Sequence, residues 1–194
     1  MQGRDLRVLR PRDSESLLDE SAFEDEEFLP YWAELWPSGP ALARAIAGRA
    51  LRGARTLELG CGLGVPSIAA ALAGGRVLAT DWSAEAVAMA AANAALNDAE
   101  VETLVCSWTE PEAILARSPW DLVLAADVLY EARNADVLLA LLPRLVDASG
   151  EVWIADPGRA AASGFLERAD AEWTRRSMPS DELPQGAIHR LRRR

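Results

Sequence analysis

Lysine is absent from this sequence, and cysteine, histidine and long apolar runs are scarce. All 20 basic residues are arginines, and they are outnumbered by 30 acidic residues, which gives a formal net charge of -10. This acidic balance argues against a general binder of phosphate backbones, because long-range repulsion opposes such binding. No nucleic-acid partner is therefore expected, and the arginine-rich tail at 190–194 is interpreted as a solvated chain end.

The two cysteines, Cys61 and Cys106, do not suggest a disulfide framework or a metal site, so no metal is expected. The single histidine, His189, lies near the chain end and is a poor candidate for a general base. No apolar stretch is long enough to span a bilayer, and residues 1–11 lack the apolar core of a secretory signal. A soluble cytoplasmic protein without membrane association is the expectation.

What the sequence does contain is enough apolar residues for one well-buried domain. Half of its 194 residues are hydrophobic, and neither an internal repeat nor a second domain is visible. We expect a flexible acidic segment at 1–29, followed by a single domain at 30–194.

Within that domain, apolar runs alternate with helical patterns. Strands are expected at 56–59, 77–80, 101–105, 122–126, 151–155, 172–177 and 187–192. Helices are expected at 41–51, 65–73, 84–96, 110–117, 134–146 and 160–171. This order predicts a Rossmann-like, doubly wound α/β fold with a mostly parallel seven-stranded sheet and helices on both faces. The last two strands have no helix between them, which predicts an antiparallel last strand.

A glycine turn follows the first strand and organises the rest. Leu57 and Leu59 fit a buried parallel strand, and Gly60, Gly62 and Gly64 allow a tight turn and a close approach to a ligand. Cys61 lies within the turn, where a small side chain is needed.

Acidic and aromatic residues follow the other strands, at the edge where open α/β sheets bind ligands. Asp81, at the end of the second strand, can accept both hydroxyls of a ribose. Trp82 and Trp108, the latter after Ser107, can flank a flat base. Asp127 follows the central strand. Together these residues predict a pocket for an adenosine.

The acids indicate which adenosine cofactor fits. Glu58 just before the turn disfavours a diphosphate but suits an ammonium group, and the glycines read G-x-G-x-G rather than G-x-G-x-x-G. S-adenosylmethionine carries an ammonium and a sulfonium and no phosphate. An acidic pocket containing Glu58, Asp81 and Asp127 matches such a cation.

Three segments carry a family resemblance: Trp36-Pro37-Ser38-Gly39, Glu58 to Gly64, and Asp127-Val128-Leu129-Tyr130, a D-x-x-Y motif. On these, the sequence resembles the class I, seven-β-strand S-adenosylmethionine-dependent methyltransferases, and within them the protein-lysine methyltransferases. The segments Pro30–Pro37 and Asp156–Arg159 are similar to the electron transfer flavoprotein β-subunit lysine methyltransferases and their bacterial relatives.

The resemblance implies a role for each matching residue. Glu58, Gly60 and Gly62, with Cys61 and Gly64 in the same turn, hold the methionine end of the cofactor. Asp81 holds the ribose, and Trp82, Ser107 and Trp108 border the adenine. Trp36 closes over the methionine moiety. Asp127 lies beside the transferred methyl group and orients the acceptor amine, while Tyr130 shapes the acceptor entrance; these two are the catalytic candidates.

The resemblance further implies transfer of a methyl group to a protein side chain, a lysine amine, with S-adenosylhomocysteine as the product. The β subunit of electron transfer flavoprotein and a ribosomal protein are the candidate acceptors, and a monomer or weak dimer is expected. Methylation of a small-molecule amine, a non-catalytic S-adenosylmethionine-binding module and a nicotinamide-dependent oxidoreductase remain alternatives.

Overall fold

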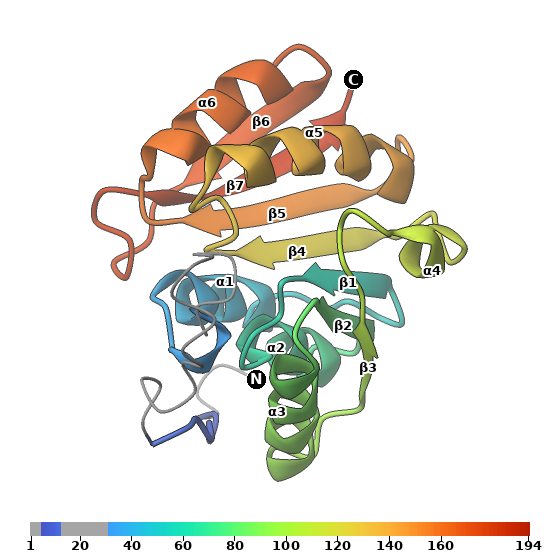
Figure 1. Cartoon of the computed structure of the whole chain (residues 1–194), viewed down its shortest axis with the longest axis vertical. Coiled ribbons are helices and arrows are strands. Elements are labelled where there is room, and N and C mark those ends of the chain that lie inside the picture. The colour runs from blue at the N-terminus through green and yellow to red at the C-terminus, as the bar shows by residue number, and fades with distance from the viewer. Residues whose placement is uncertain (1–4, 13–30) are drawn as a thin grey trace, which may run out of the picture.

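The computed structural model describes residues 5–12 and 31–194, and its centre is one seven-stranded sheet (Figure 1). The strands are β1 (Arg55–Leu59), β2 (Arg76–Asp81), β3 (Val101–Val105), β4 (Leu122–Ala126), β5 (Glu151–Asp156), β6 (Trp173–Met178) and β7 (Ala187–Arg193). Their order across the sheet is β3-β2-β1-β4-β5-β7-β6. All neighbours from β3 to β5 are parallel, whereas β7 runs antiparallel to both β5 and β6. The predicted fold class, including the antiparallel last strand, is therefore confirmed.

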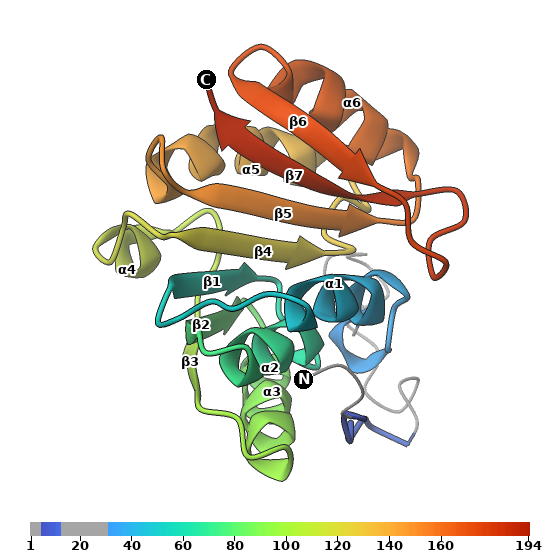
Figure 2. The ribbon, with the colours of Figure 1, turned by 180° about the vertical axis from the view of Figure 1, so that it is seen from behind.

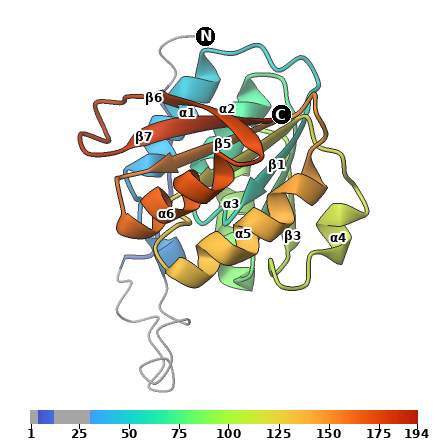
Figure 3. The ribbon, with the colours of Figure 1, turned by 90° about the horizontal axis from the view of Figure 1, so that it is seen from above.

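Helices cover both faces of the sheet. They are α1 (Ser38–Ala47), α2 (Val65–Leu72), α3 (Ala84–Leu96), α4 (Glu112–Leu115), α5 (Ala132–Leu145) and α6 (Ala160–Ala169). In Figure 3, α5 and α6 lie on one side of the sheet and α1 and α2 on the other. Seen from behind, α1, α2 and α3 lie in front of the sheet, with α1 packed on β4 and β5, while no helix lies in front of β6 and β7 (Figure 2).

The direction of winding reverses between β1 and β4. From β1 the chain adds β2 and β3 outward on one side, and from β4 it adds β5 on the other. The helices that follow β1 and β4 therefore leave on opposite faces, which opens a crevice at the carboxyl ends of these two strands. Glu58, Asp81, Asp127 and Asp156 all lie at this edge, because the parallel register aligns Leu59 with Thr80 and Ala125.

Aliphatic side chains from both faces form the core. Leu57, Val123 and Ile154 pack under α5 and α6, and Leu124 and Trp153 pack under α1. The central strand β4 is buried on both faces, as its unbroken apolar sequence predicts. Replacing one of these fully buried leucines by alanine typically costs about 2–5 kcal/mol. The core therefore holds the strand ends, and with them the crevice, in place.

Most helix and strand ends lie within about three residues of their predicted positions, the largest shift being the end of the first helix at Ala47 rather than 51. Ser83 caps α3 as expected, since its hydroxyl accepts the Ala86 N–H at 3.1 Å. No helix among the described residues is long and apolar enough to cross a membrane.

Part of the segment expected to be flexible is described, and it is docked on α3. The backbone N–H groups of Arg7 and Leu9 donate to the side chains of Asn97 and Asn93, at 3.0 and 2.7 Å. In return, the side-chain NH2 groups of Asn97 and Asn93 donate to the backbone carbonyls of Arg7 and Leu9, at 2.7 and 3.0 Å. Residues 1–4 and 13–29 of that segment lie outside the described residues.

Candidate functional site

A cavity of about 400 Å³ opens at the crevice between β1 and β4. It is walled by the glycine turn, by the ends of β2 and β4, and by the aromatic segment that precedes α1. The sequence-predicted site residues that line it are Trp36, Glu58, Gly60, Cys61, Gly62, Gly64, Asp81, Trp82, Trp108, Asp127 and Tyr130. Side chains from five separated stretches of the chain thus meet around one space.

The glycine turn needs its glycines because the backbone is left-handed and crowded. Gly60 has a φ of 66°, and a Cβ there would lie 3.1 Å from Val128 and 3.2 Å from the Trp108 ring. Gly64 has a φ of 77°, and its Cβ would lie 2.9 Å from that of Ala90 on α3. Cys61 lies between them, and burial raises the pKa of its thiol. The turn is therefore close-packed and presents backbone to the cavity.

Asp81 connects this turn to the end of β2. One carboxylate oxygen accepts the Gly62 N–H at 3.0 Å and the other accepts the Ser83 N–H at 3.1 Å. Burial raises the pKa of Asp81, with these N–H groups opposing the shift. Each oxygen retains a lone pair for a further donor. The neighbouring Trp82 lines the cavity and is 47% exposed.

Glu58 lies at the base of the cavity and is almost fully buried. The backbone N–H of Ser67 in α2 donates to its carboxyl at 2.9 Å, and the Ser67 hydroxyl donates to the same oxygen. Burial outweighs these bonds and raises the pKa of Glu58 to about 8. Burial thus favours the protonated form of Glu58 in the ligand-free protein, and a cation would favour its ionised form.

Asp127 adopts a left-handed conformation, with a φ of 59°, directly after β4. One of its carboxylate oxygens accepts the Ser38 N–H at 3.1 Å, and the other pairs with the guanidinium of Arg159. The same guanidinium lies 3.6 Å from Asp156 and 5.8 Å from the centre of the Trp36 ring. Arg159 thus joins the ends of β4 and β5 to the segment before α1.

Three aromatic side chains surround the mouth of the cavity. Tyr31 lies 5.4 Å from Tyr130 and 6.4 Å from Trp36, measured between ring centres. The indole N–H of Trp36 donates to the Tyr31 carbonyl at 2.8 Å. All three rings are more than a third exposed, so they present apolar surface to an incoming group.

Ser107 is the predicted site residue that the structure does not bring to the cavity. Its hydroxyl lies 2.8 Å from that of Thr109 within its own turn, and Trp108 lines the wall instead. Conversely, Tyr31, Trp32, Glu131 and Arg159 line the cavity but were not among the predicted site residues. The segments 31–36 and 156–159 were conspicuous in the sequence, yet nothing local assigned these side chains to the site.

The arrangement suits a flat, hydroxyl-bearing and positively charged ligand. Trp82 and Trp108 can border a base, Asp81 can accept from hydroxyls, and the acids at Glu58 and Asp127 favour a cation. Among residues 5–12 and 31–194 there is no cluster of histidine, cysteine or acidic residues suited to a metal ion.

The chain is similar to known methyltransferases over most of its length. Residues 25–172 match the family described as lysine methyltransferase. A curated relative, the electron transfer flavoprotein β subunit lysine methyltransferase of Xenopus laevis, is 38% identical over 143 residues, which are 69% of this chain and 55% of the relative. The chain spans about half the length of the first curated relatives that it matches.

Solved structures share the fold. The ribosomal protein L11 methylase of Lactobacillus delbrueckii subsp. bulgaricus superposes with a TM-score of 0.60 at 25% identity, covering 78% of this chain and 77% of that one. Magnesium protoporphyrin IX methyltransferase from Synechocystis PCC 6803, determined with bound SAM, gives 0.64 at 20% identity, covering 90% and 94%. Because the family match extends over most of the chain, including the glycine turn and the D-x-x-Y motif, this protein belongs to the lysine methyltransferase family.

Proposed function

We propose that this protein transfers a methyl group from S-adenosylmethionine to the side-chain amine of a lysine in another protein. The observation that carries the proposal is the convergence of Glu58, Asp81 and Asp127 on one cavity beside a glycine turn. The acid before the glycine turn disfavours a diphosphate, and Arg159, the arginine that lines the cavity, is already paired with Asp127, so a cationic adenosine cofactor is favoured over a dinucleotide. Membership of the lysine methyltransferase family supports the reaction and the acceptor atom.

The cavity residues fit this cofactor. Asp81 would accept the ribose hydroxyls through its remaining lone pairs, and Trp82 and Trp108 would border the adenine. Glu58 and the backbone of Gly60 and Gly62 would hold the ammonium end, with Cys61 and Gly64 shaping the turn. Trp36 would cover the methionine moiety. Magnesium protoporphyrin IX methyltransferase, which has the same fold, was determined with this cofactor bound.

When bound, the cofactor supplies a methyl group on a sulfonium that is already activated for in-line displacement. The protein must then orient a neutral amine and exclude water. Asp127 is fixed by Arg159 and Ser38, so its carboxylate has a defined direction in the cavity wall. We propose that Asp127 orients the acceptor amine. Tyr31, Trp36 and Tyr130 would enclose the aliphatic part of the lysine side chain at the mouth.

The β subunit of electron transfer flavoprotein and ribosomal protein L11 are the candidate acceptors, because relatives of this chain are named for them. For the compartment we retain the cytoplasm, which is compatible with two cysteines that are both free and buried.

Calorimetry with S-adenosylhomocysteine tests the cofactor. We expect binding that is lost in Asp81→Ala and kept in Glu102→Ala, which removes an exposed carboxylate on β3. Tight binding of NADH, without binding of S-adenosylhomocysteine, would overturn the assignment in favour of an oxidoreductase.

Tritiated S-adenosylmethionine tests the acceptor. We expect a labelled protein band in a lysate of the source organism that yields methyl-lysine on hydrolysis and disappears with Asp127→Ala. The enzyme has no lysine, so it cannot contribute label on that side chain. Label in the small-molecule fraction alone would instead indicate a small-molecule N-methyltransferase, and cofactor binding without any label would indicate a non-catalytic module. Purified electron transfer flavoprotein and L11 are the first defined substrates to try.

A further inference from the structure

One half of a sheet face carries a group of arginines that the site does not use. β5, β7 and β6 are adjacent, and their register places Trp153, Arg190 and Arg176 in one row across the three strands. Arg192 and Thr174 form the next row. α1 packs on this face at β5 and reaches β7, but the view from behind shows no helix in front of β6 and β7 (Figure 2). We call Arg49, Arg176, Arg190 and Arg192 the arginine face.

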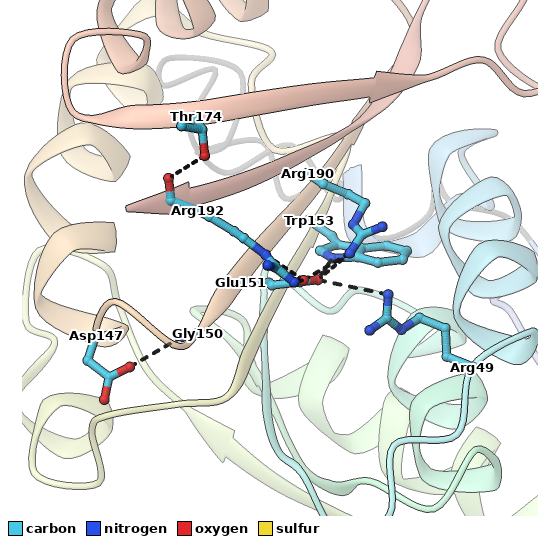
Figure 4. A network of polar contacts seen from close by, with 8 residues as sticks. All are labelled: Arg49, Asp147, Gly150, Glu151, Trp153, Thr174, Arg190 and Arg192. Atoms are coloured by element: carbon cyan, nitrogen blue, oxygen red, sulfur yellow. Dashed lines mark hydrogen bonds and ion pairs between the residues drawn. The ribbon is translucent and has the colours of Figure 1, made fainter. Parts of the chain in front are cut away.

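The arginine face is built around one buried carboxylate, that of Glu151 (Figure 4). Arg190 donates to both of its oxygens at 2.9 Å, and Arg192 donates through its Nε at 2.8 Å. The indole N–H of Trp153 donates at 2.7 Å, and Arg49 lies 4.0 Å away. The guanidiniums of Arg49 and Arg190 also lie over the Trp153 ring, 5.0 and 4.6 Å from its centre.

This network leaves a surplus of positive charge. One carboxylate is shared by three arginines, and Arg176, the exposed fourth, has no ion pair among the described residues. Asp147, the other acid in Figure 4, accepts hydrogen bonds from Ser149 and Gly150 in its own turn. Arg192 is 61% and Arg49 is 39% exposed at the side chain, so their remaining donors face solvent. In a chain of net charge -10, this is a localised cationic surface.

The geometry points to a function in recognition, because two of the arginines are already fixed. Arg190 and Arg192 are held by Glu151, so less side-chain freedom is lost when they bind a further anion. Guanidinium groups pair with carboxylates through parallel N–H bonds. We propose that the arginine face is a docking surface for an acidic segment of a partner protein, rich in aspartate and glutamate.

Two features favour an acidic protein segment over a nucleic acid. The chain's overall negative charge opposes the approach of a long polyanion, whereas a short acidic segment interacts mainly with the local surface. The surface also lies at the amino end of β5, and five residues of strand, about 16 Å, separate Glu151 from Asp156 at the cavity edge. A bound segment would therefore hold a partner without entering the cavity.

Fluorescence anisotropy with a labelled deca-glutamate peptide, at about 0.15 M salt, tests the docking surface. The key variant is Arg176→Gln/Arg192→Gln. Its matched control is Arg175→Gln/Arg193→Gln, which removes the same charge from the same two strands on the opposite face, where Arg193 contacts Pro143 of α5. We expect the first pair to weaken binding at least tenfold and the second less than twofold. Arg176→Gln alone, which breaks no ion pair, should weaken it about threefold and guards against misfolding of the double variant.

Absence of peptide binding by the native protein would overturn the proposal. Equal weakening by the two pairs would overturn it as well, since overall charge and not this face would then be responsible. Tighter binding of a ten-nucleotide single strand than of the peptide would assign the face to nucleic acid. Self-association abolished by Arg176→Gln/Arg192→Gln would assign it to a second copy of the chain.

Discussion

Two buried glutamates at opposite ends of the parallel strands have pKa values shifted in opposite directions. Glu58, at the carboxyl end of β1, is 1% exposed, and Glu151, at the amino end of β5, is 6% exposed. Burial raises the pKa of Glu58 to about 8. Burial also acts to raise the pKa of Glu151, but hydrogen bonds from Trp153, Arg192 and Arg190 outweigh it and lower that pKa to about 2.

The difference arises because Glu58 has no cationic partner among the described residues, whereas three arginines surround Glu151. Among residues 5–12 and 31–194, Ser67 alone donates to Glu58, and no arginine pairs with it. A buried acid without a cation is destabilising when ionised, which suits a site whose ligand supplies the positive charge. Glu151 is instead paired with arginines within the fold, and its lowered pKa means that folding stabilises the ionised form of this side chain.

The largest expected effect is on ligand binding at Glu58. Glu58→Gln keeps an acceptor for Ser67 but cannot carry charge, so the affinity for S-adenosylhomocysteine at pH 8.5 should fall about 10- to 100-fold, the value of a hydrogen bond to a charged group. Calorimetry measures this. Glu34→Gln, which alters an exposed carboxylate at the rim paired with Arg10, should change affinity less than about threefold if only the buried acid matters. Equal losses of affinity in Glu58→Gln and Glu34→Gln would show that the buried carboxylate has no special role in binding.

The next effect is on stability at Glu151. Glu151→Gln leaves Arg190 and Arg192 without their charged partner and should reduce the free energy of unfolding by about 2 kcal/mol, or lower Tm by roughly 4–8 °C. Thermal unfolding followed by circular dichroism measures it. Glu102→Gln breaks an exposed ion pair with Arg117, in which nitrogen and oxygen are 2.7 Å apart. This change should lower the free energy of unfolding by less than about 1 kcal/mol. Affinity for S-adenosylhomocysteine should be unchanged in Glu151→Gln, and a loss there would contradict the separation of the two regions.

A third effect is the pH dependence of binding. Because the pKa of Glu58 is raised to about 8, binding of the ammonium group of S-adenosylhomocysteine below that pH should be coupled to loss of the Glu58 proton. Affinity for S-adenosylhomocysteine should therefore rise between pH 6 and 8, by up to about tenfold per unit, and level off above 8. Titrations in matched buffers measure the slope. The slope should vanish in Glu58→Gln, and a flat profile in the native protein would argue against contact between Glu58 and the ligand.

The smallest expected effect is that the stabilities of the native protein and of Glu151→Gln become similar at low pH. The pKa of Glu151 is lowered on folding, so its stabilisation is present above its unfolded value near 4.5 and is lost as pH falls through about 2. The difference in unfolding free energy between the native protein and Glu151→Gln should therefore shrink from pH 5 downward, to less than about 0.5 kcal/mol near pH 2. Urea denaturation at a series of pH values measures it. A constant difference would mean that packing, rather than charge, accounts for the loss.

Local features of this protein were well predicted from its sequence. The strand before Gly60, the Ser83 cap and the order of the helices follow from periodicity, glycines and capping residues, which act over a few neighbouring positions. The parallel alternation then places Glu58, Asp81 and Asp127 at one edge, so most of the candidate site was also predictable. Ser107 does not line the cavity, because a turn after an edge strand can orient its side chain in several ways, and here it hydrogen-bonds to Thr109.

The sequence by itself therefore determined the strand order along the chain, the glycine turn and the placement of Glu58, Asp81 and Asp127 at one edge of the sheet. Only the tertiary structure decided that Arg159 pairs with Asp127, that Tyr31 meets Tyr130, and that Arg190 and Arg192 converge on Glu151. These partners lie 32 to 99 positions apart in the chain. Their contact depends on how the strands are ordered and paired across the sheet, which no local pattern of residues specifies.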